Sequence, residues 1–527
     1  MFPSRHVDDI DLFTGAMTEM RRPGALVGPT FACIIGQQFE NYKRGDRFFY
    51  ERPNPVVGFT RGQLRAIKQT SLAKILCSTM RGFIDVQPNL MDRPSRWNRI
   101  MFDLLTVQMH HYLTLEYRIY IVCLAGISSP RVRSVTSGFL PNARCISRKV
   151  HSGKAFISDG HTPFLTHFGQ FLDHDVVSTP DVQPRPRLQQ NQRSSFIDGT
   201  IIYGWDAEKE ARLREPGTGD HRSLETVPMT VMYISLLRRH NLFVEELRKL
   251  PLPWTSELLY QEAKRIVIAE LQHIVYNEFL PRVLGRRTME QFGLWSAPLY
   301  EETYSPFVDP RTTSGFSAAA FRFGHSLVRN VHNQIGPGGS PVKHLYLLNH
   351  FDRLETHLKN FPGGNTEGFA RWMKCSSSSK ADGAFVDGLQ NNLFRCKGPR
   401  CPMGGGATRA FDLPALNIQR GRDHGLPSYT KWRYWCSGRR TMIFTPNAIG
   451  LSDHSQLEAN ILRKTYKHVD DIDLYTGAMT ETRLPGALVG PTFACIIGKQ
   501  FSNYKRGDRF FYERPDSVMA FTPGKRN

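Results

Sequence analysis

The feature that most limits the fold of this 527-residue chain is a long internal repeat. Residues 6–60 return at 468–522 with a constant offset of 462, and the stretch 24–36 reappears unchanged at 486–498. This spacing is far longer than the roughly 20–50 residues of solenoid repeats. The repeat therefore indicates tandem domains, with one body and the end of another in this chain.

Domain boundaries follow from where the two copies stop. The first copy continues into residues 61–91, where apolar residues have helical spacing, whereas the second copy ends before that helix. We expect residues 1–95 to be the C-terminal remnant of a preceding domain and 96–127 to be a linker or aberrant segment. Residues 128–527 then form one domain that lacks its last helix, which 61–91 would supply if the chain is circularly permuted.

Composition and charge narrow the class of protein. Hydrophobic residues make up 40% of the chain and charged residues 22%, which is typical of a globular protein and excludes disordered or collagenous chains. The formal net charge is +20, so an acidic partner is expected. Because the basic residues are dispersed and no nucleic-acid-binding motif accompanies them, we expect no nucleic acid as partner.

Compartment signals are sparse. The N-terminus has no apolar run typical of a signal peptide, so the chain either stays in the cell or has lost its original start. Charged residues interrupt the apolar stretch 100–127, and we expect no membrane span there. Nine cysteines are too few for a small disulfide scaffold, and an odd number cannot all pair within one chain.

A polar trio interrupts an otherwise apolar helix predicted over 162–175, with Thr162 as N-cap and Pro163 at its first position. Gln170 and His174 are four residues apart and Asp173 lies on the same side, so an amide, an imidazole and a carboxylate converge. A functional site and a satisfied core histidine both remain open on this pattern.

Two further segments carry chemistry. In 193–204, short oxygen-bearing side chains at even spacing suit calcium, although a plain Ser/Thr-rich turn explains them as well. The segment 314–328 is predicted as a buried helix that contains Arg322 and His325. His325 is either an iron ligand or a core histidine. A long helix is predicted over 254–280, ended by Pro281, which favours a mainly α fold.

Five motifs, taken together, resemble the animal haem peroxidases, and most of all the peroxidasin and chorion peroxidase type. They occur in the order of the family and are 169–175 (GQFLDHD), 194–198 (SSFID), 219–225 (GDHRSLE), 321–325 (FRFGH) and 413–427 (LPALNIQRGRDHGLP). The resemblance implies a mainly α fold with few short strands, in which haem b lies between a distal and a proximal helix.

Residue roles follow from the same resemblance. It implies that His174, Arg222 and Gln170 are catalytic, and that His325 is the proximal ligand of the haem iron. Other residues expected at the haem are Asn417, which bonds the proximal imidazole, Arg322, and the ester-linking carboxylates Asp173 and Glu225. The implied calcium ligands are Asp175, Ser194, Phe196 through its carbonyl, Asp198 and Thr200.

The activity implied is reduction of hydrogen peroxide with oxidation of phenolic, tyrosyl or halide donors, in the extracellular matrix or in response to oxidative stress. A disulfide between Cys436 and Cys495 and secretion are implied as well, with an acidic extracellular matrix as a partner. The connections 176–190 and 204–221 are shorter than is usual in the family. The alternative is therefore a non-catalytic, matrix-binding module that has lost haem competence.

Overall fold

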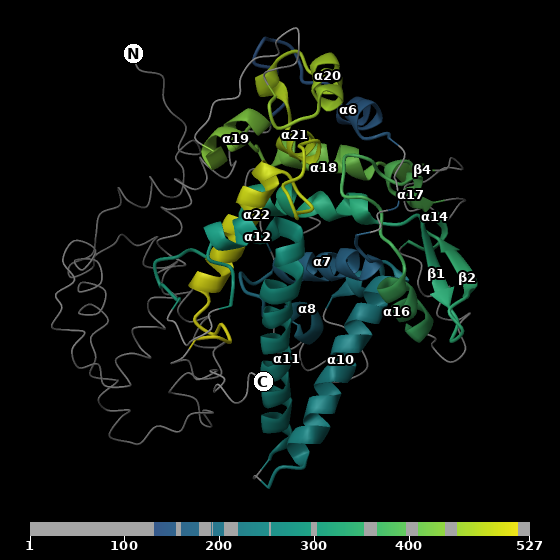
Figure 1. Ribbon diagram of the computed structural model, residues 1–527, viewed down its shortest axis with the longest axis vertical. Coiled ribbons are helices and arrows are strands. Elements are labelled where there is room, and N and C mark those ends of the chain that lie inside the picture. The colour runs from purple at the N-terminus through teal and green to yellow at the C-terminus, as the bar shows by residue number, and fades with distance from the viewer. Residues whose placement is uncertain are drawn as a thin grey trace, which may run out of the picture. The chain divides into compact units, whose positions relative to one another are not determined.

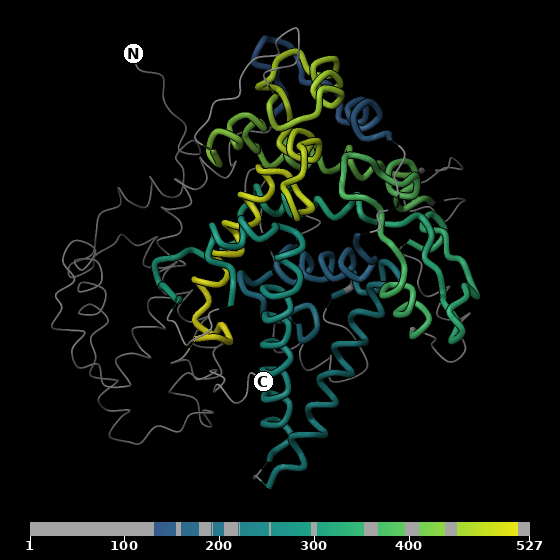
Figure 2. Tube along the Cα trace, viewed as in Figure 1, coloured from purple at the N-terminus to yellow at the C-terminus, as the bar shows by residue number. Residues whose placement is uncertain are grey.

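The computed structural model describes eleven parts of the chain (Figures 1 and 2): residues 131–153, 157, 160–178, 191, 193–204, 220–251, 254–296, 303–351, 366–396, 409–437 and 451–514. The first repeat copy at 6–60, the helix expected in 61–91 and the segment 96–127 lie outside these residues. So do 179–190 and 205–219, which make up most of the two short connections.

The described body is mostly helical, which confirms the predicted fold class. Its strands form two small antiparallel hairpins, β1 (Val331–Ile335) with β2 (Pro341–Tyr346) and β3 (Leu393–Cys396) with β4 (Arg409–Phe411). Of the helices in the described ranges, none has both the length and the apolar character needed to cross a membrane.

Helix α7 (Pro163–Val176) carries the predicted polar trio and lies inside the main hydrophobic core. It begins where predicted, because Thr162 is extended and the fixed φ of Pro163 suits the first helical position. Buried Phe168, Phe171 and Leu172 pack α7 into the core. Helices α10 (Val227–Arg248) and α11 (Ser256–Ile274) run side by side as a long pair, coloured teal in Figure 1.

The prediction that Pro281 ends the long helix was wrong. A π-helical turn, η4 (Val275–Phe279), follows α11, and the chain continues directly into α12 (Leu280–Gln291). Pro281 occupies the first turn of α12, where the backbone N–H that proline lacks has no required partner. The change in hydrogen-bond register therefore allows the chain to pass a proline without ending.

The single helix predicted over 314–328 was also wrong. Helix α13 (Ser314–Ala318) stops at Ala319, whose φ of −138° is not helical, and a 3-10 helix, η5 (Ala320–Leu327), follows. At the break, Nε of Arg322 donates a 2.8 Å hydrogen bond to the carbonyl of Ser317. Side chains three residues apart align on a 3-10 helix, so η5 places Arg322 and His325 above one another.

The second repeat copy is an integral part of this body. It spans η6 (Val469–Asp471), α21 (Leu474–Met479) and α22 (Pro491–Gly507), and α22 packs against α12. The predicted disulfide between Cys436 and Cys495 is present, which confirms that expectation. It joins α19 (Tyr429–Ser437) to α22.

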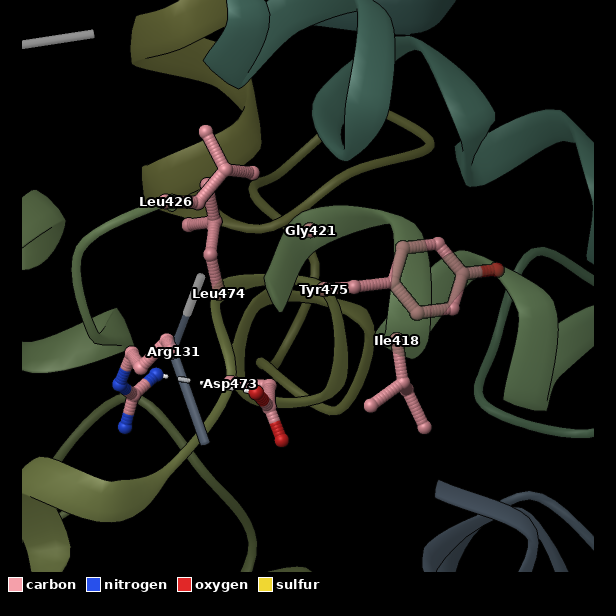
Figure 3. Close-up of a pocket in the computed structure, with 7 residues that line it drawn as sticks. All are labelled: Arg131, Ile418, Gly421, Leu426, Asp473, Leu474 and Tyr475. Carbon is pink, nitrogen blue, oxygen red and sulfur yellow. Dashed lines mark ion pairs between the residues drawn. The ribbon is translucent and has the colours of Figure 1, made fainter. Parts of the chain in front are cut away.

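Asp473 is the centre of a buried ionic cluster that ties this copy to the rest. Arg422, on α18 (Leu413–Asp423), donates two hydrogen bonds of 2.9 and 2.7 Å to its carboxylate, and Tyr466 donates a third. Figure 3 shows Arg131 beside the same carboxylate, at 3.7 Å. The cavity drawn there has a volume of about 10 Å³, room for roughly one water molecule and not for a substrate.

The remaining helical elements are shorter or lie at the periphery. They are α6 (Ala143–Val150), α8 (Thr200–Tyr203), η3 (His221–Leu224), α14 (Leu347–His350), α16 (Thr366–Cys375), α17 (Asp387–Gln390) and α20 (Gln456–Thr465).

Candidate active site

The distal side of the site is built on one face of α7. Gln170 and His174 are one helical turn apart, and Glu225 reaches them from the segment between η3 and α10. The Nε2 of Gln170 donates a 2.9 Å hydrogen bond to Oε2 of Glu225, and Nε2 of His174 lies 3.9 Å from the same oxygen. The structure therefore brings together three predicted site residues, of which only two are neighbours in sequence.

Arg222 reaches the distal helix through the backbone of α7. Its Nη2 donates to the carbonyl of His174 and its Nη1 to the carbonyl of Val177, each at 3.1 Å. Carbonyls in the last turn of a helix have no intrahelical donor and carry partial negative charge, which a guanidinium satisfies. Arg222 is thus placed against the end of α7 that carries His174.

Asp220 holds Arg222 in that position and was not singled out from the sequence. Its buried carboxylate accepts a 2.7 Å hydrogen bond from Nη2 of Arg222 and also bonds Arg193. Burial opposes ionisation, but the hydrogen bonds and charge of Arg222, together with Arg193, keep the pKa of Asp220 well below its ordinary value. Asp220 therefore remains charged and fixes the guanidinium.

Asp173, on α7, is near both a predicted distal residue, Arg222, and a predicted proximal one, Arg322. Burial raises the pKa of its carboxyl to about 6, and the positive charges of Arg322 and Arg222 act against that rise. Its Oδ1 is buried and has no hydrogen-bond partner. A buried carboxyl oxygen without a hydrogen-bond partner costs free energy unless another group binds it. The lack of a protein partner is therefore expected for an atom that contacts a cofactor.

On the proximal side, a buried amide links the two residues that η5 aligns. The Oδ1 of Asn417, on α18, accepts a 3.2 Å hydrogen bond from Arg322, and its Nδ2 lies 2.9 Å from Nδ1 of His325. Burial, together with the charge of Arg322, lowers the pKa of His325 to about 3. His325 is therefore neutral at physiological pH, which is the form that binds metals.

The five predicted calcium ligands gather at the end of α7. The carboxylate of Asp175 accepts hydrogen bonds from Gly199 N, Thr200 Oγ1 and Ile201 N at 3.1–3.3 Å. Gly199 has a positive φ of 67°, which glycine tolerates best, and this turn directs the loop back towards α7. Asp198 accepts from Thr200 N, and Ser194 donates to the carbonyl of Phe196.

The donor set of this loop suits calcium. Burial, with a smaller contribution from the nearby Asp198, raises the pKa of Asp175 to about 7. Two buried carboxylates with hydroxyl and carbonyl oxygens around them are the hard donors that Ca²⁺ takes, and a cation would relieve their repulsion. No cluster of three or more His, Cys, Asp or Glu residues arranged for a metal occurs in the described part of the chain.

A third carboxylate connects this loop to the C-terminal segment. The carboxylate of Asp508 accepts hydrogen bonds from Phe510 N and from Gln272 Nε2, which also donates to the carbonyl of Ile197. Burial raises the pKa of Asp508 to about 7, with a further contribution from Asp198. The sequence offers no signal for this contact, because Asp508 and Asp198 are 310 residues apart.

The residues present fit a haem group. A Cβ built on Gly324, next to His325, would meet nothing within 4 Å, so the backbone there borders open space. The open space at Gly324 offers a surface for the flat group. The Oδ1 of Asp173, which has no hydrogen-bond partner, offers a carboxyl oxygen, and the neutral imidazole of His325 offers a metal ligand.

Comparison with known families agrees with this assignment. The sequence profile of the family described as Animal haem peroxidase matches residues 2–91, 122–185 and 216–527. The chain therefore belongs to the animal haem peroxidase family.

Named relatives are peroxidases of several animals. The chain is 63% identical over 484 residues to a peroxidase-like protein of Margaritifera margaritifera, which covers 76% of this chain and 61% of that protein. It is 30% identical to the chorion peroxidase of Drosophila melanogaster, over 68% of this chain and 47% of the relative. The chain thus spans less than two thirds of the length of these relatives.

Solved structures share the fold. Peroxidase A from Dictyostelium discoideum superposes with a TM-score of 0.62 at 24% identity, covering 74% of this chain and 88% of that chain. A fatty acid alpha-dioxygenase of Arabidopsis thaliana gives a TM-score of 0.57 at 16% identity, covering 76% of each chain. The same architecture therefore occurs in proteins with different names.

Proposed function

We propose that the chain is a haem-dependent peroxidase that reduces hydrogen peroxide and oxidises a phenolic, tyrosyl or halide donor. The observation that carries this proposal is a pair of connected clusters on two elements that pack against each other, α7 and η5. The first cluster is Gln170, Glu225 and His174, and the second is Arg322, Asn417 and His325. Haem, when bound, supplies the redox chemistry that cleaves peroxide and withdraws electrons from the donor.

The distal residues handle the proton. His174 takes a proton from hydrogen peroxide and returns it to the leaving oxygen, as a general base and then a general acid. Arg222 holds the end of the helix that carries His174 and contributes positive charge where negative charge develops. Gln170 donates to Glu225, which fixes the carboxylate beside the imidazole.

The remaining site residues hold the cofactor and the metal. His325 is the proposed iron ligand, oriented by Asn417, with Arg322 beside both. Asp173 and Glu225 are the proposed carboxylates for ester links to haem. Calcium, bound by Asp175 and by oxygens of Ser194, Phe196, Asp198 and Thr200, would clamp the end of α7 that positions His174.

The place of action is proposed to be extracellular. The disulfide between Cys436 and Cys495 is of the kind that forms and persists in an oxidising compartment. In that setting the net charge of +20 favours acidic matrix polymers as a partner. An oxidative-stress role follows from the consumption of peroxide.

Haem reconstitution tests this function. We expect the purified chain to take up haem with a Soret band, to lose that band in His325→Ala, and to oxidise a phenol only when peroxide is present. The matched control is His424→Ala, since the pKa of His424 is also lowered to about 4 by burial. A Soret band that His325→Ala leaves unchanged would contradict the ligand assignment, and absence of haem uptake would favour the non-catalytic, matrix-binding alternative.

A further inference from the structure

Gln272, on α11, is a buried glutamine that bonds two segments far apart in the sequence. Its Nε2 donates a 3.0 Å hydrogen bond to the carbonyl of Ile197 and a 3.2 Å hydrogen bond to Oδ2 of Asp508. Its Oε1 accepts a 3.0 Å hydrogen bond from the backbone N–H of Tyr512. None of these residues has a role in the chemistry proposed above.

The orientation of the Gln272 amide is fixed by the chemistry of its partners. A backbone carbonyl only accepts and a backbone N–H only donates, so Nε2 must face Ile197 and Oε1 must face Tyr512. Asp508 accepts the second proton of Nε2. A rotated amide would oppose oxygen to oxygen at Ile197 and leave buried polar groups unsatisfied. The side chain therefore has one favourable orientation, in which it holds both segments at once.

The carbonyl that Gln272 holds lies inside the calcium loop (residues 194–200). Ile197 stands between Phe196, whose carbonyl is a proposed calcium ligand, and Asp198, whose carboxylate is another. A peptide unit is planar, so holding the carbonyl of Ile197 also fixes the direction in which the chain enters Asp198. Gln272 thereby constrains the geometry between two proposed ligands without itself binding the ion.

Gln272 belongs to a stripe of α11 that contacts the calcium loop and the short helix after it. Lys264, Ile268 and Gln272 are four residues apart, so their side chains lie on one face of α11. Nζ of Lys264 lies 5.1 Å from the ring centroid of Tyr203, and a Cβ built on Gly199 would lie 3.7 Å from Ile268. This face of α11 therefore supports the loop at several points, and Gln272 adds the hydrogen bond.

The second segment, 508–514, docks on the residues that directly follow Gln272. The hydroxyl of Tyr512 lies 2.8 Å from Nδ1 of His273, and the ring of Phe511 packs edge to face on Tyr276 with 5.3 Å between the centroids. Segment 508–514 is part of the second repeat copy. A residue of α11 thus connects the second repeat copy to the calcium loop.

We propose that Gln272 is a positioning residue of the calcium site and couples calcium binding to the docking of segment 508–514. Calcium holds Phe196 and Asp198 in place, which keeps the carbonyl of Ile197 where Gln272 bonds it, and the docked segment holds the Gln272 amide in the same orientation. Such coupling is reciprocal, so each event strengthens the other by the same factor. The inference rests on the calcium assignment in the proposed function and adds the residue through which 508–514 affects that site.

Calorimetric titration of the full chain with calcium chloride, after a chelator has removed bound calcium, tests one side of the coupling. Gln272→Met keeps the length of the side chain and removes its hydrogen bonds. We expect its calcium dissociation constant to rise about tenfold, within the range of about 5–150-fold for coupled sites. Gln390→Met is the matched control, because Gln390 is also buried and its Nε2 donates to the carbonyl and the hydroxyl of Ser147, on α6. It should lower the melting temperature and leave calcium affinity unchanged.

Hydrogen exchange tests the reciprocal side, and in the wild type it needs no variant. Segment 508–514 contains the N–H of Phe510, bonded to Asp508, and the N–H of Tyr512, bonded to Gln272. We expect calcium to slow exchange in 508–514 more than in α6. In Gln272→Met, the two regions should respond to calcium equally.

The outcomes separate this inference from the proposed function. Equal calcium affinity in Gln272→Met and the wild type, or wild-type exchange in 508–514 that responds to calcium no more than α6 does, overturns the coupling. A wild-type chain that binds no calcium overturns both the calcium assignment and the coupling. A chain that shows the coupling but takes up no haem supports this inference and overturns the proposed peroxidase function.

Discussion

Replacement of Asn417 with leucine removes the group that joins Arg322 to His325. Leucine has a similar size, but it leaves Nη1 of Arg322 without its acceptor in the core, and Asn417 itself is fully buried. A hydrogen bond to a charged group is worth about 1.5–3 kcal/mol and a neutral one about 1 kcal/mol. Asn417→Leu is therefore expected to lower the free energy of unfolding by about 3 kcal/mol, roughly a hundredfold in the folding equilibrium.

Asn417→Asp is the informative companion variant. Its carboxylate still accepts from Arg322, so the positive charge stays paired, and it favours the His325 tautomer that carries the ring proton on Nδ1 in place of the tautomer that accepts there from the amide. We expect Asn417→Asp to lose less than half as much stability as Asn417→Leu, and the added negative charge to raise the pKa of His325 above about 3.

Urea unfolding measures the two stabilities, and titration with haem measures affinity through the Soret band. Because the amide sets the orientation and basicity of the proposed ligand, Asn417→Leu should weaken haem binding by about tenfold or more. Wild-type stability in Asn417→Leu, or equal losses in the two variants, would refute the reasoning about Arg322. Unchanged haem affinity in Asn417→Leu would refute the link to His325.

Three further outcomes are expected. Asp473→Asn leaves Arg422 buried without its counter-charge and should cost about 3–5 kcal/mol in urea unfolding, with much of the loss recovered by Arg422→Met combined with Asp473→Leu. Removal of calcium by a chelator should lower the melting temperature. Calcium added back at about 100 times its dissociation constant should raise the free energy of unfolding by about 2.7 kcal/mol, and Asp198→Ala should abolish this response. Burial lowers the pKa of His151 from 6.5 to about 4, so the unfolded chain binds the proton more readily than the folded chain. The contribution of neutral His151 to the free energy of unfolding is therefore complete above pH 6.5, and about 3 kcal/mol of it is lost as the pH falls towards 4. Unfolding midpoints measured across that range should be less pH-dependent in His151→Gln than in the wild type.

The sequence was sufficient where the information is local. The start of α7 at Thr162 and Pro163 needs only the conformational preferences of those two residues, and the convergence of Gln170 with His174 needs only the helical period. Both are present in the structure. The disulfide between Cys436 and Cys495 was anticipated from family resemblance, since nine cysteines leave many pairings open.

The sequence was insufficient where distant segments decide the backbone. The pattern of 314–328 does not show that the helix breaks at Ala319. At the break, the carbonyl of Ser317 accepts a hydrogen bond from Arg322, and Gly315 lies close to Trp432, which belongs to a helix far away in the sequence. The π-helical turn before Pro281 is equally invisible in a list of apolar positions. Both departures lie next to site residues or core aromatics, where tertiary packing overrides the local helix preference of the sequence.

The surroundings of His167 show the same limit inside the distal motif. A histidine in an apolar stripe predicts only a buried imidazole, and the rings that His167 contacts, those of His332 and Trp372, lie in other elements. The sequence could have drawn attention to it only through its spacing of three from Gln170 and seven from His174.

The contacts of the second repeat copy also show what the first copy retains. The described part of the second copy has eleven buried polar residues, and ten of them are identical in the first copy, while Ser502 is matched by Glu40. The ten are Asp471, Asp473, Thr476, Thr480, Glu481, Thr492, Gln500, Lys505, Asp508 and Glu513, matched by Asp9, Asp11, Thr14, Thr18, Glu19, Thr30, Gln38, Lys43, Asp46 and Glu51. Tyr475 differs, since its counterpart is Phe13. The hydroxyl of Tyr475 is buried without a hydrogen-bond partner. The first copy therefore keeps nearly all of the polar residues that are buried in the second copy, and it lacks the hydroxyls of Ser502 and Tyr475.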